Sequence, residues 1–140
     1  MMKNTKALSI RQPYVELILH YGKDVENRTW SPRYRGALFL HASQTCDRKT
    51  ARIFEFTEEE ILSMPLGAIV GAVDLIDVVK KSDSPWHSSG CYGLVLANPR
   101  ALKKPVPCKG KLNLWTIPEK IEEEIHEIRF IKTVNRDRGK

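Results

Sequence analysis

The first thirty residues change from a strand pattern to a helix pattern and back again. Residues 6–11 alternate polar and apolar side chains, which predicts a half-buried strand. Pro13 is placed to open a helix, because proline is favoured at the first helical position. Gly22 stands where a left-handed residue would end this helix, and residues 25–30 are expected to be extended. The apolar positions of the helix recur at helical spacing and are Val15, Ile18 and Leu19.

The middle of the chain alternates between strand and helix patterns. Residues 36–41 are almost wholly apolar, which predicts a central strand covered on both faces. Residues 47–64 mix charges with helix formers and include a capping-box pattern over residues 57–60, so we expect one or two helices there. Residues 68–79 are the longest strand-like run, and Gly71 within it predicts a bulge.

The last third is more broken, and it ends on a helix pattern. In chain order we expect a polar loop over residues 80–90, a strand over 91–97, a turn at Asn98-Pro99, a proline-rich connection over 105–110 and a strand over 112–117. Residues 119–133 are expected to form an amphipathic helix. Its apolar positions are Ile121, Ile125, Ile128 and Ile131.

These elements predict an α+β fold. Five or six strands at uneven spacing, with helices in the gaps, favour a small mixed or antiparallel β-barrel with flanking helices. Regular βαβ alternation is absent, so a doubly wound sheet is only the second choice. At 140 residues the chain is most simply one core domain, which we place at residues 1–118. Residues 119–140 would add the amphipathic helix and a basic tail.

Composition narrows the setting of the protein. The aliphatic runs are short and interrupted, so we expect no segment that crosses a membrane. The first six residues have no apolar stretch of the signal-peptide kind, which argues against secretion. The three cysteines are odd in number and form no C-x-x-C pair, which favours reduced thiols, a cytoplasmic location and no zinc ribbon. The net charge of +6 suits a polyanionic partner.

The segment Gly22-Lys23-Asp24-Val25-Glu26-Asn27-Arg28-Thr29-Trp30 concentrates charge at the predicted junction of helix and strand. If residues 25–30 are extended, the side chains at even positions from 24 to 30 share a face. Glu26 and Arg28 would then be close enough to pair, with Lys23 turned toward the end of the helix. One interpretation is an ion pair that only closes the junction, but for Lys23 and Arg28 we favour a functional role, and for Glu26 we weigh the two equally. A cluster of two cations and a carboxylate also suits a site that grips or acts on a ligand.

These residues resemble the ASCH domain family, a branch of the PUA-like superfamily. The resemblance rests on Leu8-Ser-Ile-Arg-Gln-Pro13 and on Gly22-Lys23-x-x-Glu26-x-Arg28-x-Trp30. Further matching segments are Tyr34-Arg-Gly-x-Leu-x-Leu-His-Ala-Ser43, Gly67-Ala-Ile-Val-Gly71, Tyr92-Gly-x-Val-Leu96, Pro105-x-Pro107-x-Lys-Gly110 and Leu114-Trp115. The resemblance covers residues 7–118 and implies a β-barrel with a groove beside the first helix, lined by the Lys-Glu-Arg motif.

The resemblance also implies functions. Family members are regarded chiefly as RNA-binding or nucleic-acid-binding modules. Some relatives are hydrolases: ribonucleases, or amidohydrolases that remove an acyl group from modified cytidine. The amidohydrolase type carries a lysine and a threonine at positions that match Lys23 and Glu26, and this chain has glutamate in place of that threonine.

The candidate site residues follow from charge, position and chemistry. Lys23 and Glu26 are the candidate catalytic residues, with Glu26 as a general base or as the group that orients Arg28. Nucleic-acid contacts are expected from Arg11, Lys23, Arg28, Trp30, Arg33, Arg35, His41 and Ser43. Trp30 and Trp86 lie in polar surroundings and are candidates for base stacking, whereas Trp115 is expected in the core. We expect no cofactor and no metal, because the Cys and His residues lack ligand spacing.

Three functional hypotheses remain, in order of preference. The first is a module that binds RNA or single-stranded nucleic acid with the basic groove. The second is a hydrolase that acts on RNA or a modified nucleoside in the same groove. The third is a non-catalytic adaptor whose basic groove binds another protein, with the C-terminal amphipathic helix as a candidate contact. The sequence leaves open whether the ligand is RNA, DNA or a free nucleoside, and it leaves open the oligomeric state.

Overall fold

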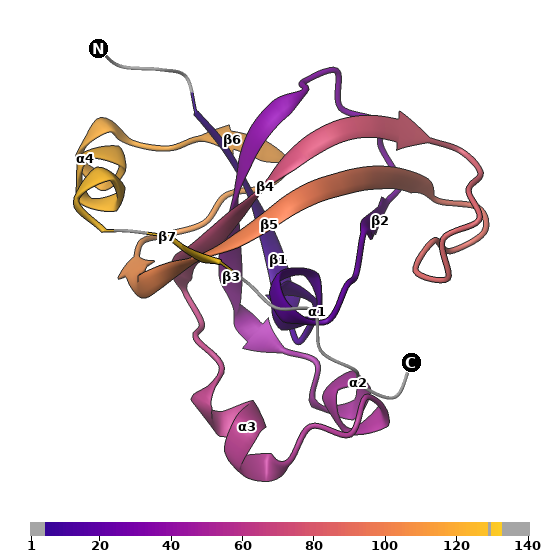
Figure 1. Ribbon diagram of the computed structural model, residues 1–140, viewed down its shortest axis with the longest axis horizontal. Coiled ribbons are helices and arrows are strands. Elements are labelled where there is room, and N and C mark those ends of the chain that lie inside the picture. Colours follow the sequence, from indigo (N-terminus) through magenta and orange to yellow (C-terminus); the bar gives the residue numbers. More distant parts are fainter. Residues whose placement is uncertain (1–4, 129, 133–140) are drawn as a thin grey trace.

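The computed structural model describes residues 5–128 and 130–132, which form one mixed sheet with flanking helices (Figure 1). In chain order the elements are β1 (Lys6–Gln12), α1 (Tyr14–His20), β2 (Val25–Arg28), β3 (Gly36–Cys46), α2 (Arg48–Ile53), α3 (Glu58–Ser63), β4 (Ala68–Val79), β5 (Tyr92–Pro107), β6 (Leu114–Thr116), α4 (Glu119–Glu127) and β7 (Phe130–Lys132). Within this part of the chain, none of the helices combines the length and the hydropathy that a membrane crossing needs.

The strands form a seven-stranded sheet in the order β2-β5-β4-β3-β1-β6, with β7 added beside β5. The β1–β3 ladder is parallel and the other ladders are antiparallel. Figure 1 shows β4 and β5 curving together across the molecule, which gives the sheet its barrel-like form. The predicted α+β fold, a small mixed barrel with flanking helices, is therefore confirmed, with one strand more than the five or six expected.

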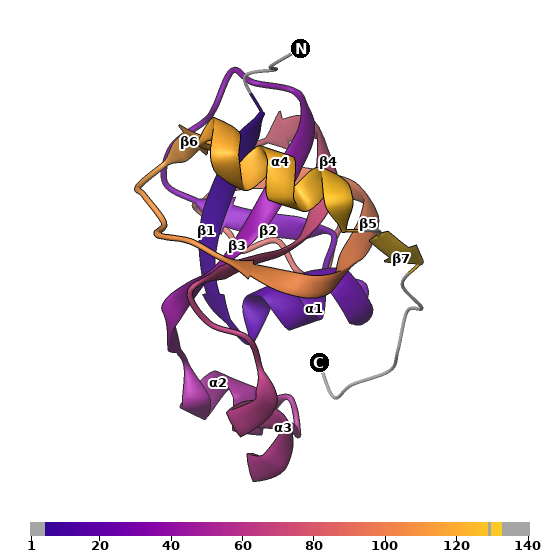
Figure 2. The same ribbon diagram turned by 90° about the vertical axis from the view of Figure 1, so that its left-hand side faces the viewer.

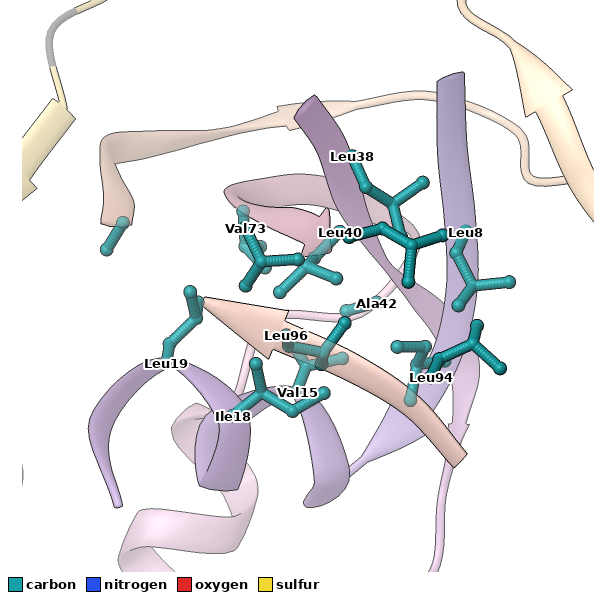
Figure 3. Packing of buried hydrophobic residues seen from close by; sticks show 14 of the residues in the cluster. Leu8, Val15, Ile18, Leu19, Leu38, Leu40, Ala42, Val73, Leu94 and Leu96 are labelled. Carbon is teal, nitrogen blue, oxygen red and sulfur yellow. The ribbon is translucent and has the colours of Figure 1, made fainter. Parts of the chain in front are cut away.

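Helix α1 forms where the sequence predicts it and packs against the sheet. The Gln12 side chain accepts a hydrogen bond from the backbone N–H of Glu16 (3.1 Å), which satisfies one donor of the first turn. The apolar face of the helix is buried in the main core together with residues of β1, β3, β4 and β5 (Figure 3). Gly22 has a φ of 79°, so the predicted left-handed end of the helix is confirmed.

Residues 47–64 form two short helices that project from one end of the sheet (Figure 2). Asp47 caps α2 by accepting from the backbone N–H of Thr50. The capping box at the start of α3 is present as predicted, with Thr57 and Glu60 each bonding to the other's backbone N–H. This pair of helices packs against Leu17 and Tyr21 of the α1 segment.

Strand β5 corrects two sequence predictions. Asn98-Pro99 is not a turn between elements, because β5 runs without interruption over sixteen residues. The ladder to β4 instead shifts register there: Ala97 lies opposite Asp74, and Arg100 lies opposite Ala72. Asn98 has a φ of 54° and donates to Asp74 at 2.7 Å, so side-chain bonding holds the chain at an irregularity inside the strand. The proline-rich segment also continues β5 as far as Pro107.

The C-terminal helix is shorter than predicted. Helix α4 ends at Glu127, and residues 130–132 pair with β5 as β7, so Ile131 belongs to a strand rather than to the helix. Ile125 is buried in a second apolar cluster between α4 and the sheet, with Ile121 and Ile128 packed against it. This packing occupies the apolar face of the helix and weakens the adaptor hypothesis. Residues 133–140, assigned to a basic tail, lie outside the described residues, and the boundary at residue 118 stays a prediction.

Gly71 lies where β4 closely approaches its antiparallel neighbour β5 and the side chain of Leu19 in α1. The register of β4 shifts between Ile69 and Gly71, so the predicted irregularity is present. A Cβ at residue 71 would lie 2.5 Å from the carbonyl oxygen of Arg100 and 2.9 Å from Cδ2 of Leu19. Because the backbone oxygen cannot move aside cheaply, we expect Gly71→Ala to lower the free energy of unfolding by about 1–3 kcal/mol. Urea denaturation of the two proteins measures this difference, and an unchanged midpoint would contradict it.

Candidate nucleic-acid interface

A groove of about 720 Å³ lies among β1, α1, β2, α2 and the connection between β4 and β5. This connection, residues 80–91, is hereafter the 80–91 loop, and Figure 1 shows it beyond β2. Residues lining the groove are Ser9, Ile10, Arg11, Tyr14, Lys23, Glu26, Asn27, Arg28, Thr29, Trp30, Ser43, Phe54, Pro85, Trp86, Ser88 and Cys91. The predicted motif therefore lies in a concave surface beside the first helix.

Glu26 links the two cations of the motif. One carboxylate oxygen lies 3.6 Å from Nζ of Lys23. The other oxygen accepts from Nε of Arg28 at 3.1 Å and also lies 3.1 Å from Nη2 of Arg28. Nη2 of Arg28 also donates to the carbonyl oxygen of Ser9 at 3.1 Å, which ties β2 to β1. The pairing of Glu26 with Arg28 expected from an extended strand is thus present, and the three groups together carry one excess positive charge.

Lys23 is the most unusual group of the site. Its residue is only 4% exposed, and Nζ donates to the carbonyl oxygen of Val25 at 2.6 Å. The ammonium group lies 5.5 Å from the ring centre of Tyr14 and 5.6 Å from that of Trp86, which are cation–π distances. Burial lowers the pKa of Lys23, and the nearby Glu26 carboxylate acts in the opposite direction. The lysine is therefore a desolvated group at the floor of the groove.

The 80–91 loop is fixed to β2 by side chains of the same motif. The Asn27 amide donates to the carbonyl oxygen of Trp86 at 2.9 Å and accepts from the backbone N–H of Ser88 at 2.8 Å. The Ser84 hydroxyl donates to Asp24 at 2.6 Å. Trp86 stacks on Phe54 of the α2 segment with ring centres 5.6 Å apart. The loop thus forms a wall of the groove, and Trp86 covers Lys23.

A family model described as the ASCH domain matches residues 8–124. The chain belongs to the ASCH domain family. This family is part of the PUA-like superfamily, so the resemblance read from the sequence is confirmed.

Relatives and solved structures agree with this assignment. The chain is 26% identical over 132 residues to "Activating signal cointegrator 1" of Homo sapiens and, to the same extent, of Mus musculus. These matches cover 83% of this chain and 23% of each relative, so the chain spans about a quarter of their length. Two crystal structures of ASCH from Zymomonas mobilis, one of them of a point mutant, have the same fold at 10% identity with TM-scores of 0.58 for the mutant and 0.57. They cover 89% and 93% of this chain, and 98% of each solved chain is covered.

The ASCH fold brings most of the predicted site residues together. Lys23, Glu26, Arg28 and Trp30 line the groove from the β2 segment, and Arg11 and Ser43 line it from β1 and β3. Arg33 and Arg35 belong instead to the exposed segment before β3 and are not among the lining residues. Arg35 bonds to the carbonyl oxygens of Pro32 and Tyr34.

The groove lining also includes residues that were not predicted from the sequence, among them Tyr14, Asn27 and Phe54. Tyr14 falls on the apolar stripe of its helix, and strict alternation puts Asn27 on the opposite face from Glu26. Asn27 lies inside the motif itself, which is a local signal for it. Phe54 is brought to the site by α2, and nothing local to the motif indicates it.

Asp24, predicted to share the face of Glu26, instead lines a smaller pocket beside α1. Among the described residues, no three His, Cys, Asp or Glu side chains gather as metal ligands.

His41, predicted as a contact residue, lies behind the groove wall. It is 2% exposed and is not among the lining residues. Its Nε2 lies 2.8 Å from the carbonyl oxygen of Cys108, so Nε2 carries the proton and Nδ1 accepts from the Ser9 hydroxyl at 3.1 Å. Ser9 in turn accepts from the indole N–H of Trp115, a residue buried as predicted. His41 therefore positions Ser9 rather than reaching the groove itself.

The buried imidazole predicts a pH dependence of stability. Burial lowers the pKa of His41, and its bond to Cys108 opposes this in part. The folded state then binds fewer protons than the unfolded state, so the stabilisation is complete above the unfolded pKa of about 6.5 and is lost as the pH falls through the folded pKa. We expect the free energy of unfolding to fall on acidification below about pH 6.5, and to fall less in His41→Gln. Urea denaturation across this pH range tests it, and parallel curves for the two proteins would contradict it.

Proposed function

We propose that this ASCH domain binds single-stranded RNA in the groove around Lys23, Glu26 and Arg28. The observation that carries the proposal is the juxtaposition of an uncompensated cation with aromatic rings in one concave surface. Two cations share one carboxylate on the floor of the groove. Nζ of Lys23 lies 5.5 Å from the ring centre of Tyr14 and 5.6 Å from that of Trp86. Phosphate needs a cation and a nucleobase needs a flat apolar face, and the groove offers both.

Arg28 is the group best placed to meet a phosphate. Its side chain is 23% exposed, and its Nε and Nη2 are already fixed by Glu26 and Ser9. Its Nη1 has no hydrogen-bond partner within the described residues, so this donor is available to a ligand. Because the carboxylate of Glu26 also holds the guanidinium in one orientation, little conformational entropy would be lost on binding.

The walls of the groove suit a base. Trp30 and Trp86 are partly exposed there, and a base stacked on such a ring is worth roughly 1–3 kcal/mol. The Ser43 hydroxyl oxygen is buried without a hydrogen-bond partner among the described residues, although its residue lines the groove. An unpaired buried hydroxyl is costly, so a base edge that reached it would recover a hydrogen bond.

The test is a fluorescence-anisotropy titration of a labelled single-stranded RNA of about eight nucleotides, a length within known site sizes for single strands. Binding should weaken steeply with salt, by a slope of about −0.7 in log K against log salt for each phosphate neutralised. A duplex of the same sequence and a single-stranded DNA serve as competitors. Absence of binding to RNA at low salt would contradict the proposal.

A hydrolase acting on RNA or a modified nucleoside is the second candidate. The observation that favours it is the lowered pKa of Lys23 beside Glu26 in a groove, since perturbed groups gather at catalytic sites. Against it, both carboxylate oxygens of Glu26 already face cations, which weakens this residue as a general base. Incubation of the protein with RNA and with an acylated cytidine, followed by separation of products, tests it. Products that persist after Lys23→Met with intact folding would exclude this lysine.

A further inference from the structure

A second cationic element touches the wall of the groove. Residues 108–113 connect β5 to β6 and are hereafter the 108–113 loop; Figure 2 shows this connection running beside β1. Lys109 and Lys111 are both exposed, and Leu112 is 88% exposed between β5 and β6. The loop contains no acidic residue. It therefore presents positive charge and one apolar side chain to solvent.

Gly110 of the loop packs directly against the side chain of Ser9. A Cβ at Gly110 would lie 2.5 Å from Oγ of Ser9 and 2.6 Å from Cε1 of His41, so only glycine allows this close approach. The carbonyl oxygen of Cys108 accepts from His41 and holds the start of the loop. Ser9 lines the groove, and its own carbonyl oxygen accepts from Arg28. A continuous line of contacts thus runs from Arg28 across Ser9 to Gly110. Lys109 and Lys111 flank Gly110 in the sequence.

The size of the groove limits what it can hold. A volume of about 720 Å³ is in the range of sites for small molecules, so a polynucleotide of several residues does not fit within the groove. Its further phosphates must therefore lie outside the groove. Over Ser9 a phosphate would meet Lys109 and Lys111. In the other direction, past the 80–91 loop, a phosphate would meet Lys80 and Lys81. There the carboxylate of Asp83 would repel it.

We infer that the binding path continues from Arg28 across Ser9 to the 108–113 loop, and that the ligand is a polynucleotide with at least two consecutive nucleotides rather than a free nucleoside. This inference rests on the proposed function and specifies its ligand class. Lys109 and Lys111 neutralise the phosphate that follows the nucleotide in the groove. The close packing of Gly110 on Ser9 positions the backbone that carries these two lysines next to the groove.

The experiment compares ligands of different length on matched charge variants. Affinities of a labelled single-stranded RNA and of a competing nucleoside monophosphate are measured for wild type, Lys109→Glu/Lys111→Glu and Lys103→Glu/Lys104→Glu. The control pair is exposed on β5 and changes the net charge equally, but it lies outside both the groove lining and the 108–113 loop. Circular dichroism and urea midpoints confirm that each variant folds.

We expect the 109/111 variant to bind RNA about tenfold or more weakly, with a salt slope reduced by about 0.7 for each lost phosphate contact. Its affinity for the monophosphate should stay near that of wild type, and the control variant should lose much less RNA affinity. Equal losses in both double variants, or none at 109/111, would overturn the inference. The proposed function would still stand if Arg28→Gln weakens RNA binding as expected. If wild type binds neither ligand, the proposed function and the inference fail together.

Discussion

Glu26→Ala is expected to lower the free energy of unfolding by about 3 kcal/mol, the lower end of what removal of one partner costs in a buried ion pair. Glu26 has a 10% exposed side chain and faces both Lys23 and Arg28. Its removal leaves two cations together without a counter-charge in a desolvated site. The cost is limited because the Arg28 side chain is 23% exposed and can turn toward water. Urea denaturation at neutral pH measures the loss.

Lys23→Met is the matched comparison for Glu26→Ala. Methionine keeps an apolar stem between Tyr14 and Trp86 and removes a charge whose burial already lowers its pKa. Glu26 would keep its pair with Arg28. We therefore expect stability to change by less than about 1 kcal/mol, or to rise, because replacing a buried charge by an apolar side chain is often neutral or stabilising. A larger loss for Lys23→Met than for Glu26→Ala would contradict this description of the network.

Arg28→Gln should weaken the binding of single-stranded RNA by about thirtyfold or more, equivalent to roughly 2 kcal/mol for the loss of one partner of a desolvated charge contact. The substitution removes the donor that faces the groove and leaves Lys23 and Glu26 as a neutral pair. Affinity from anisotropy titrations at fixed salt is the measurement. Glutamine is preferred to glutamate here, because a second carboxylate beside Glu26 would disturb folding as well as binding.

Arg33→Gln is the control for that experiment, because it removes the same charge from the exposed segment before β3, away from the groove lining. Its RNA affinity should stay within about twofold of wild type, since an exposed charge acts only through the screened field. If Arg33→Gln and Arg28→Gln weaken binding equally, the binding surface is not confined to the groove and includes the exposed segment before β3.

Much of the site was predictable because its signals are local. The left-handed Gly22 ends α1, and strand periodicity places Glu26 beside Arg28, so the ion pair follows from nine consecutive residues. The capping box at Thr57 is equally local and fixes the start of α3. The position of Lys23 between two rings cannot be predicted from local signals, because Tyr14 and Trp86 come from a helix and a loop far apart in sequence.

The wrong predictions involve tertiary contacts that override local preference. Asn98-Pro99 has the composition of a turn, but pairing with β4 on both sides and the bond to Asp74 keep it inside β5. Ile131 continues a helical spacing, yet the free edge of β5 takes this segment as β7. His41 ends an apolar run, and only the pairing of β1 with β3 and the Cys108 carbonyl show that it lies behind Ser9. Such partners cannot be read from periodicity.

The three tryptophans allow the most direct test of the groove as the RNA site. Trp30 and Trp86 line it, whereas Trp115 is 5% exposed and has its indole N–H bonded to Ser9. The measurement is a titration of the ¹⁵N-labelled protein with a short single-stranded RNA, followed through the indole N–H resonances in two-dimensional NMR spectra. RNA bound in the groove should shift or broaden the Trp30 and Trp86 resonances more than that of Trp115. Indole resonances of Trp30 and Trp86 that stay unchanged at saturating RNA would contradict binding in the groove.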